Sequence, residues 1–187
     1  LAGIVTQFFW GGMEILVFQA FYQADPLAFP MTLQATCSYI WLQQAFLALF
    51  MGWFMENEIF EGIKSGNIVY ELYRPIDLYH MLFFRSMAHR ISRALLRCVP
   101  ILIFASLLPD PYGLSFPASS LAGVLFLLGM SLGLLVTVAF CMLVYISVFY
   151  TISPQGIRIL SVSALELLTG SILPLPFFPQ GIRRVLE

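Results

Sequence analysis

Five apolar runs, each long enough to cross a lipid bilayer, constrain this chain more than any other feature of its sequence. A bilayer core about 30 Å thick needs about 20 residues of helix at a rise of about 1.5 Å per residue. The runs cover residues 1–23, 33–54, 87–108, 119–148 and 157–173. Only 10% of the 187 residues are charged, against about a quarter in soluble domains. The sequence therefore predicts an all-α, polytopic bundle of transmembrane helices that forms one domain.

The few charges are concentrated between the second and third runs. Six of the nine Lys and Arg residues and five of the ten acids lie between residues 56 and 97. The Pro-rich breaks at 25–30 and 108–117 each carry one Asp as their only charge. Because cytoplasmic loops carry an excess of Lys and Arg, the charged block is predicted to be cytoplasmic and the two breaks to face outward. The visible N-terminus then lies on the cytoplasmic side of a multi-pass protein of the cell membrane.

An amphipathic stretch, EIFEGIKSGNIVYELYRPID, covers Glu58 to Asp77 within this block. Its apolar residues, beginning with Ile59 and Phe60, recur at helical spacing, so the charged neighbours face other directions. The pattern stops where a proline follows Arg74, because the residue before proline disfavours helical backbone. We therefore predict a cytoplasmic elbow, residues 55–85, that lies at the membrane interface and contacts a soluble partner.

A basic stripe follows the elbow. It consists of Arg85, His89, Arg93 and Arg97, and Arg90 widens it. Because four residues advance about 40° around a helix, these side chains share one slowly turning face. Two interpretations stay open. The long cationic side chains extend to lipid phosphates, or part of the stripe pairs with the acidic cluster at 56–61 or with a partner protein.

Two acids lie well inside apolar runs, Glu14 in the first and Glu166 in the fifth. An ionised carboxylate at membrane depth is costly and usually marks a pathway or a paired site. Each acid is thus either a polar group lining a route or a subunit contact, or a group protonated or hydrogen-bonded within the bundle.

Patterns of catalytic or metal-binding residues are not found in the sequence. The two histidines, His80 and His89, are nine residues apart with no Cys nearby, and no GxSxG motif occurs. The only lysine, Lys64, lies in EGIKSG, which is not a phosphate-binding P-loop. No basic domain indicates nucleic acid. We expect a chain that is not an enzyme and that binds no metal or nucleotide itself.

Two motifs in this order resemble the membrane subunit of an ATP-binding cassette exporter of the second type. One is EIFEGIKSGNIVYELYRPID after the second apolar run, and the other is GSILPLPFFPQGIRRVL after the fifth. The resemblance covers nearly the whole chain. It implies that a separate ATPase subunit binds ATP and Mg²⁺, and that a second permease subunit, the same or related, completes the pathway among membrane lipids.

The resemblance also implies roles for particular residues. The interface that couples to the ATPase would include Glu58, Ile59, Phe60, Glu61, Lys64, Leu72 and Arg74. A re-entrant outer element would cover residues 172–184, with Pro174, Pro176 and Pro179 interrupting it, before a sixth span. Since the chain starts inside an apolar run and that sixth span is not visible, we expect it to be a fragment.

An alternative class is a channel or secondary transporter driven by an ion gradient, with Glu166 as its protonatable group. An intramembrane enzyme is a third class, and no paired carboxylates, His cluster or nucleophile motif supports it.

Overall fold

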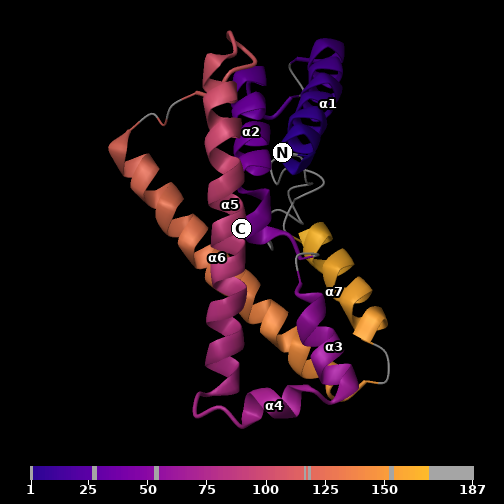
Figure 1. Cartoon of the computed structure of the whole chain (residues 1–187). Coiled ribbons are helices and arrows are strands. Elements are labelled where there is room, and N and C mark those ends of the chain that lie inside the picture. The colour runs from indigo at the N-terminus through magenta and orange to yellow at the C-terminus, as the bar shows by residue number, and fades with distance from the viewer. Residues whose placement is uncertain are drawn as a thin grey trace. The chain divides into compact units, whose positions relative to one another are not determined.

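The computed structural model describes residues 2–26, 29–52, 55–115, 117, 119–151 and 154–168. Over these residues it holds seven α-helices and no strand (Figure 1). The helices are α1 (Ala2–Ala24), α2 (Leu33–Phe50), α3 (Asn57–Ser65), α4 (Ile68–Leu72), α5 (Leu78–Leu107), α6 (Ser120–Val148) and α7 (Pro154–Leu168). The prediction of an all-α chain is confirmed for this part.

Two of these helices are long and apolar enough to cross a membrane. They are Gly3–Ala24 within α1 and Ser120–Val148, which is α6. Only 22% of the apolar stretch of each helix is buried, so most of its side chains face outward. Exposed apolar surface of this extent is compatible with a membrane location.

The other three predicted runs form helices with more polar or shorter sequences. Helix α2 has 18 residues and includes Gln34, Gln43 and Gln44, and α7 has 15 described residues. Helix α5 begins at Leu78, inside the predicted elbow and well before residue 87, where the third span was predicted to start. Among the described residues the structure therefore shows two candidate spans, and the other three predicted spans are not shown. The predicted re-entrant element at 172–184, with its three prolines, lies outside the described residues.

The described residues gather into two compact units. The first holds residues up to Leu47 together with Arg93–Gly123. In it, α1, α2 and the second half of α5 lie side by side (Figure 1). Its core contains Ile15 and Phe18 of α1, Cys37, Ile40, Trp41 and Ala45 of α2, and Cys98, Ile101 and Ala105 of α5. The Trp41 indole N–H donates to the Tyr112 carbonyl at 2.9 Å, so the loop after α5 also packs on this core.

The second unit holds Ala48–Ser92 and the described residues from Val124 onward. Its core joins the segment around α3 to the start of α5 and the second half of α6. The buried residues are Met55, Ile59, Phe60, Leu82, Cys141, Met142, Val144, Tyr145 and Val148. Ile157 and Val162 of α7 pack against this core.

Helix α3 has clear start and stop signals. Glu56 precedes it with extended backbone, Glu58 lies in its first turn and Lys64 in its last, so both charges complement the helix dipole. Gly66 follows at φ 78°, a left-handed conformation that glycine adopts without strain, and its N–H donates to the Ile63 carbonyl at 3.2 Å. The chain then turns into α4.

Candidate functional site

The part of the elbow that precedes α5, residues 55–77, is called here the α3–α4 segment. Its apolar face is covered by the chain itself: Ile59 is 3% and Phe60 5% exposed. The Phe60 ring meets the Tyr145 ring edge-on, with 5.0 Å between centroids. The resemblance predicted Ile59 and Phe60 as contacts to a partner. The two side chains instead fasten the segment to α6.

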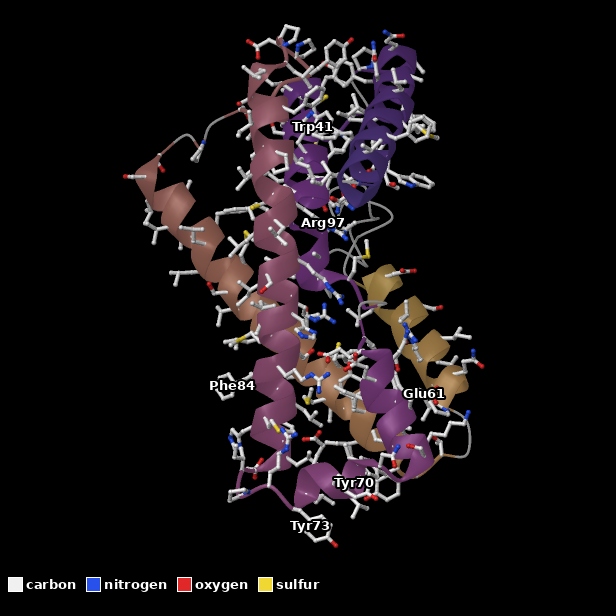
Figure 2. The ribbon with its side chains drawn as sticks, viewed as in Figure 1. Trp41, Glu61, Tyr70, Tyr73, Phe84 and Arg97 are labelled. Atoms are coloured by element: carbon white, nitrogen blue, oxygen red, sulfur yellow. The ribbon has the colours of Figure 1, made fainter. Side chains whose placement is uncertain are left out.

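The outer face of the segment is a mixture of charge and aromatic surface. Glu58, Glu61 and Lys64 of α3 are exposed. On and after α4, Tyr70 is 73% and Tyr73 81% exposed, and Tyr73 points away from the helices (Figure 2). Val69, Leu72 and Ile76 are exposed beside them. Arg74 is also exposed and pairs with Glu71 at 3.2 Å.

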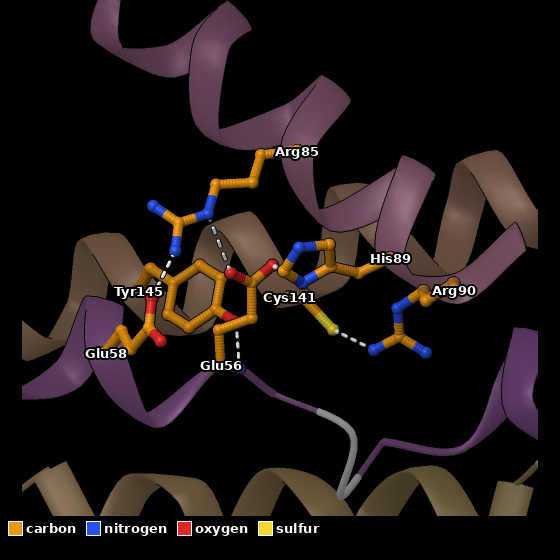
Figure 3. Close-up of polar contacts among 7 residues, drawn as sticks. All are labelled: Glu56, Glu58, Arg85, His89, Arg90, Cys141 and Tyr145. Carbon is orange, nitrogen blue, oxygen red and sulfur yellow. Dashed lines mark hydrogen bonds and ion pairs between the residues drawn. The ribbon is translucent and has the colours of Figure 1, made fainter. Parts of the chain in front are cut away.

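A buried carboxylate anchors the start of the segment (Figure 3). The Glu56 side chain is 7% exposed, and Arg85 Nε lies 3.1 Å from one of its oxygens. His89 Nδ1 lies 3.6 Å from the other oxygen. Arg85 also pairs with Glu58, so one guanidinium bridges two acids of the segment. The Glu56 backbone N–H donates to the Tyr145 hydroxyl at 2.8 Å, which adds a link to α6.

Arg90 serves a different purpose from the rest of the basic stripe. It is 1% exposed, and its Nη1 donates to the carbonyls of Leu49 at 3.1 Å and Met51 at 3.0 Å, at the end of α2. Its Nη2 lies 3.1 Å from the Cys141 sulfur. Its spacing predicted that Arg90 widens the basic stripe, whereas the structure places it inside the second unit, where it caps a helix end.

The structure thus separates the members of the stripe. Arg85 and His89 face the acids of the α3–α4 segment. Arg93 is exposed. Arg97 lies against α1 within the first unit, where a Cβ on Gly3 would meet its guanidinium at 3.1 Å. Pairing with the acidic cluster is therefore observed at one end of the stripe, and the question of lipid contact applies to Arg93.

Asp77 ends the segment and directly precedes α5. The His80 backbone N–H donates to its carboxylate at 3.0 Å, which is the contact of a helix N-cap. The His80 ring Nδ1 lies 3.1 Å from the same oxygen. The backbone hydrogen bond and then the side-chain contact from His80 hold the pKa of Asp77 below its usual range.

Polar side chains on the apolar helices have different surroundings. The Glu14 carboxylate is half-buried and accepts a hydrogen bond from the Gln44 amide at 3.4 Å. Glu166 is half-buried on α7. Gln7, which sequence analysis did not single out, is 5% exposed, and among the described residues neither of its amide atoms has a hydrogen-bond partner. Gln7 precedes Glu14 by seven residues, which is about two helical turns, so the two side chains share a face of α1. This spacing was the one feature of the sequence that could have pointed to Gln7.

Groups of three His, Cys, Asp or Glu side chains that could hold a metal are not found in the described part of the chain. A hollow of ≈ 230 Å³ beside α3, lined by residues that include Ile63, Lys64 and Phe149, is smaller than the roughly 300–1,000 Å³ of drug-sized sites.

Comparison of the chain with protein-family models, curated proteins and solved structures gave no significant match. The functional argument therefore rests on the residues and contacts above.

Proposed function

We propose that the chain is the transmembrane permease of an ATP-driven exporter, and that its α3–α4 segment docks on a separate ATPase subunit. The observation that carries this proposal is the contrast between the two faces of the segment. One face is fixed to the chain by Phe60 and Glu56, and the other exposes Tyr70 and Tyr73. Exposed tyrosines on a firmly held element are typical of the residues that dominate protein–protein contacts.

The length of α5 supports a protein rather than a lipid as the occupant of this face. Its 30 residues span about 45 Å, against about 30 Å for a bilayer core. Its first two-thirds carry Arg85, Arg90, Arg93 and Arg97, so the part suited to lipid is the apolar stretch after Arg97. Helix α4, which precedes the charged end, would then lie beyond the headgroups and within reach of a soluble subunit.

The contacts also suggest how movement of the ATPase would reach the membrane. Closure of two ATPase subunits on ATP and Mg²⁺ would displace the α3–α4 segment. Glu56 with Arg85 would pass that displacement to α5, and Phe60 with Tyr145 would pass it to α6. Closely packed helices respond to such a push by shifting as rigid bodies. Two permease chains, each with five or six spans, would bracket the route, with Glu14 and Glu166 as its polar groups.

The proposal is tested by changing the outer face alone. In proteoliposomes that contain the full-length permease and its ATPase, the double variant Tyr70→Ala/Tyr73→Ala is expected to lower ATP-dependent export about tenfold, because the loss of two aromatic anchors removes more than about 1.4 kcal/mol of binding. Reversal of charge in Glu61→Lys is expected to weaken coupling as well. Insertion into the membrane and thermal stability should not change.

Phe84→Ala is the matched control, because Phe84 is a similarly exposed aromatic residue on α5 (Figure 2). It should export normally. Normal export by both the double tyrosine variant and Glu61→Lys would contradict the proposal.

A further inference from the structure

Helix α1 carries polar residues on the face that packs inside the first unit. This face includes four positions that recur at intervals of three or four residues, namely Gly3, Gln7, Gly11 and Glu14. Gln7 and Gly11 are buried there, and Glu14 is half-buried. Polar side chains inside a candidate span are costly and usually mark a functional position.

Two other helices add polar side chains to this face at its glycines. A Cβ on Gly3 would meet the Arg97 guanidinium of α5 at 3.1 Å, and a Cβ on Gly11 would meet the Gln44 side chain of α2 at 3.2 Å. The glycines therefore let both side chains lie against α1. The Gln44 amide extends to Glu14, to which it donates at 3.4 Å. The polar row is the name used below for Arg97, Gln7, Gln44 and Glu14.

Gln7 is the member of the polar row whose hydrogen bonds are missing. Its side chain is 5% exposed, and among the described residues neither its amide nitrogen nor its amide oxygen has a partner. Buried amides are nearly always satisfied, because an unpaired one carries the full cost of its desolvation. So little of Gln7 is exposed that only a small group can reach it. Water is small, and it can both donate to the oxygen and accept from the nitrogen.

The polar row ends near the middle of the apolar helix. Glu14 follows Gly3 by eleven residues, which is about 16 Å at a rise of about 1.5 Å per residue, or about half of a bilayer core about 30 Å thick. Beyond Glu14 the buried side of α1 continues with Ile15 and Phe18, which are 5% and 8% exposed in an apolar core. The Phe18 ring meets the Phe29 ring edge-on, with 6.4 Å between centroids. The buried side is thus polar up to Glu14 and apolar after it.

We propose that the polar row is a water-accessible half-channel, which opens at the end marked by Arg97 and ends at Glu14. Water bound at Gln7 connects the two charged members of the row and hydrates the Glu14 carboxylate from that side alone. Ile15 and Phe18 close the other side. The row lies within the first unit and involves neither the α3–α4 segment nor an ATPase. The inference therefore goes beyond the exporter proposal.

The accessibility of single cysteines to silver ions tests the half-channel in the full-length protein in sealed membrane vesicles. Silver is a small cation that crosses lipid poorly and reacts with thiolates, which form in water more readily than in an apolar core. The native Cys37, Cys98 and Cys141 are first replaced by Ala, and Gln7→Cys is then introduced. Silver applied from the Arg97 side should modify this cysteine at least about tenfold faster than silver applied from the opposite side. The exposed variant Arg93→Cys, one turn earlier on α5, identifies the Arg97 side.

Three further variants define the limits of the half-channel. Glu14→Cys marks its inner end and should react from the Arg97 side as Gln7→Cys does. Phe18→Cys lies beyond that end, and Leu16→Cys lies on the outer face of α1, where Leu16 is 65% exposed. Both should react slowly from the Arg97 side. Circular dichroism checks that the variants fold, and Glu14→Cys reports on the row if Gln7→Cys does not.

Two results would overturn the proposal. One is modification of Gln7→Cys and Glu14→Cys from the Arg97 side no faster than that of Phe18→Cys. The other is equal modification from both sides, because the row would then be open along its whole length. Since the measurement needs neither ATP nor cargo, its failure is distinguishable from failure of the exporter proposal.

Discussion

Arg90 is a charged residue that is almost completely buried. Its guanidinium is buried and donates to two carbonyls at the end of α2. The last carbonyls of a helix have no partner within the helix, and a positive charge near them is favoured by the dipole. Arg90 therefore gains its hydrogen bonds from the same groups that would otherwise be unsatisfied.

Replacing Arg90 by Ala should lower the free energy of unfolding by about 3 kcal/mol, because buried acceptors of a charged donor are left unpaired. Denaturant titration of the purified protein in micelles measures this change. Arg93→Ala is the matched control, and as an exposed position it should cost no more than about 0.5 kcal/mol. Equal stability of the two variants would contradict the capping role of Arg90.

Sequence periodicity showed which residues share a helix face but not what covers that face. Arg90 follows the stripe pattern, yet its acceptors lie 41 and 39 residues earlier in the chain. Contacts at such separation depend on how α2 and α5 pack, which local spacing does not record. The contacts of Glu56 with Arg85 and His89 agree with one of the two interpretations of the basic stripe, in which part of it pairs with the acidic cluster at 56–61.

For elements, the α3–α4 segment shows the same limit. Helical spacing of Ile59 and Phe60 correctly predicted a helix with one apolar face, and Gly66 marks its end. An apolar face fits the core of its own chain or a partner equally well, so the sequence alone assigned these two residues to a partner. In the structure α6 covers these two side chains, and the exposed aromatic surface of the segment is formed by Tyr70 and Tyr73.

The N-cap of α5 makes a second prediction about an element. Since hydrogen bonds from His80 lower the pKa of Asp77, this cap stabilises α5 above the usual Asp pKa and is lost as the pH falls through the lowered value. The chain has three aspartates, so carboxyl-labelled aspartate gives few NMR signals, and Asp77→Asn assigns the relevant one.

The Asp77 signal should titrate below the usual value of about 3.9. His80→Gln should raise its midpoint, because the side-chain contact is lost while the backbone N–H still donates. A midpoint at or above the usual value in the unaltered protein would show that this cap does not form in solution.

For the whole molecule, composition and apolar runs were sufficient to predict an all-α chain, and all seven described helices agree. They were not sufficient to fix the number of spans. Helix α5 joins a charged stretch that extends to Arg97 to a shorter apolar stretch, and the glutamines of α2 reduce the apolar character of α2. A count of apolar residues does not distinguish such helices from spans, since packing against other helices can satisfy polar groups at membrane depth.

The central claim, that the α3–α4 segment docks on an ATPase, is tested most directly through Lys64. This is the only lysine of the 187 residues, and it is exposed on α3. Within these residues, an amine-reactive cross-linker applied to native membranes, followed by mass spectrometry of the cross-linked peptides, therefore reports on this one position. We predict cross-links from Lys64 to a subunit with an ATP-binding P-loop, in a pattern that changes when nucleotide is added. Export that depends on an ion gradient, with no cross-link from Lys64 to any ATP-binding protein, would contradict the claim.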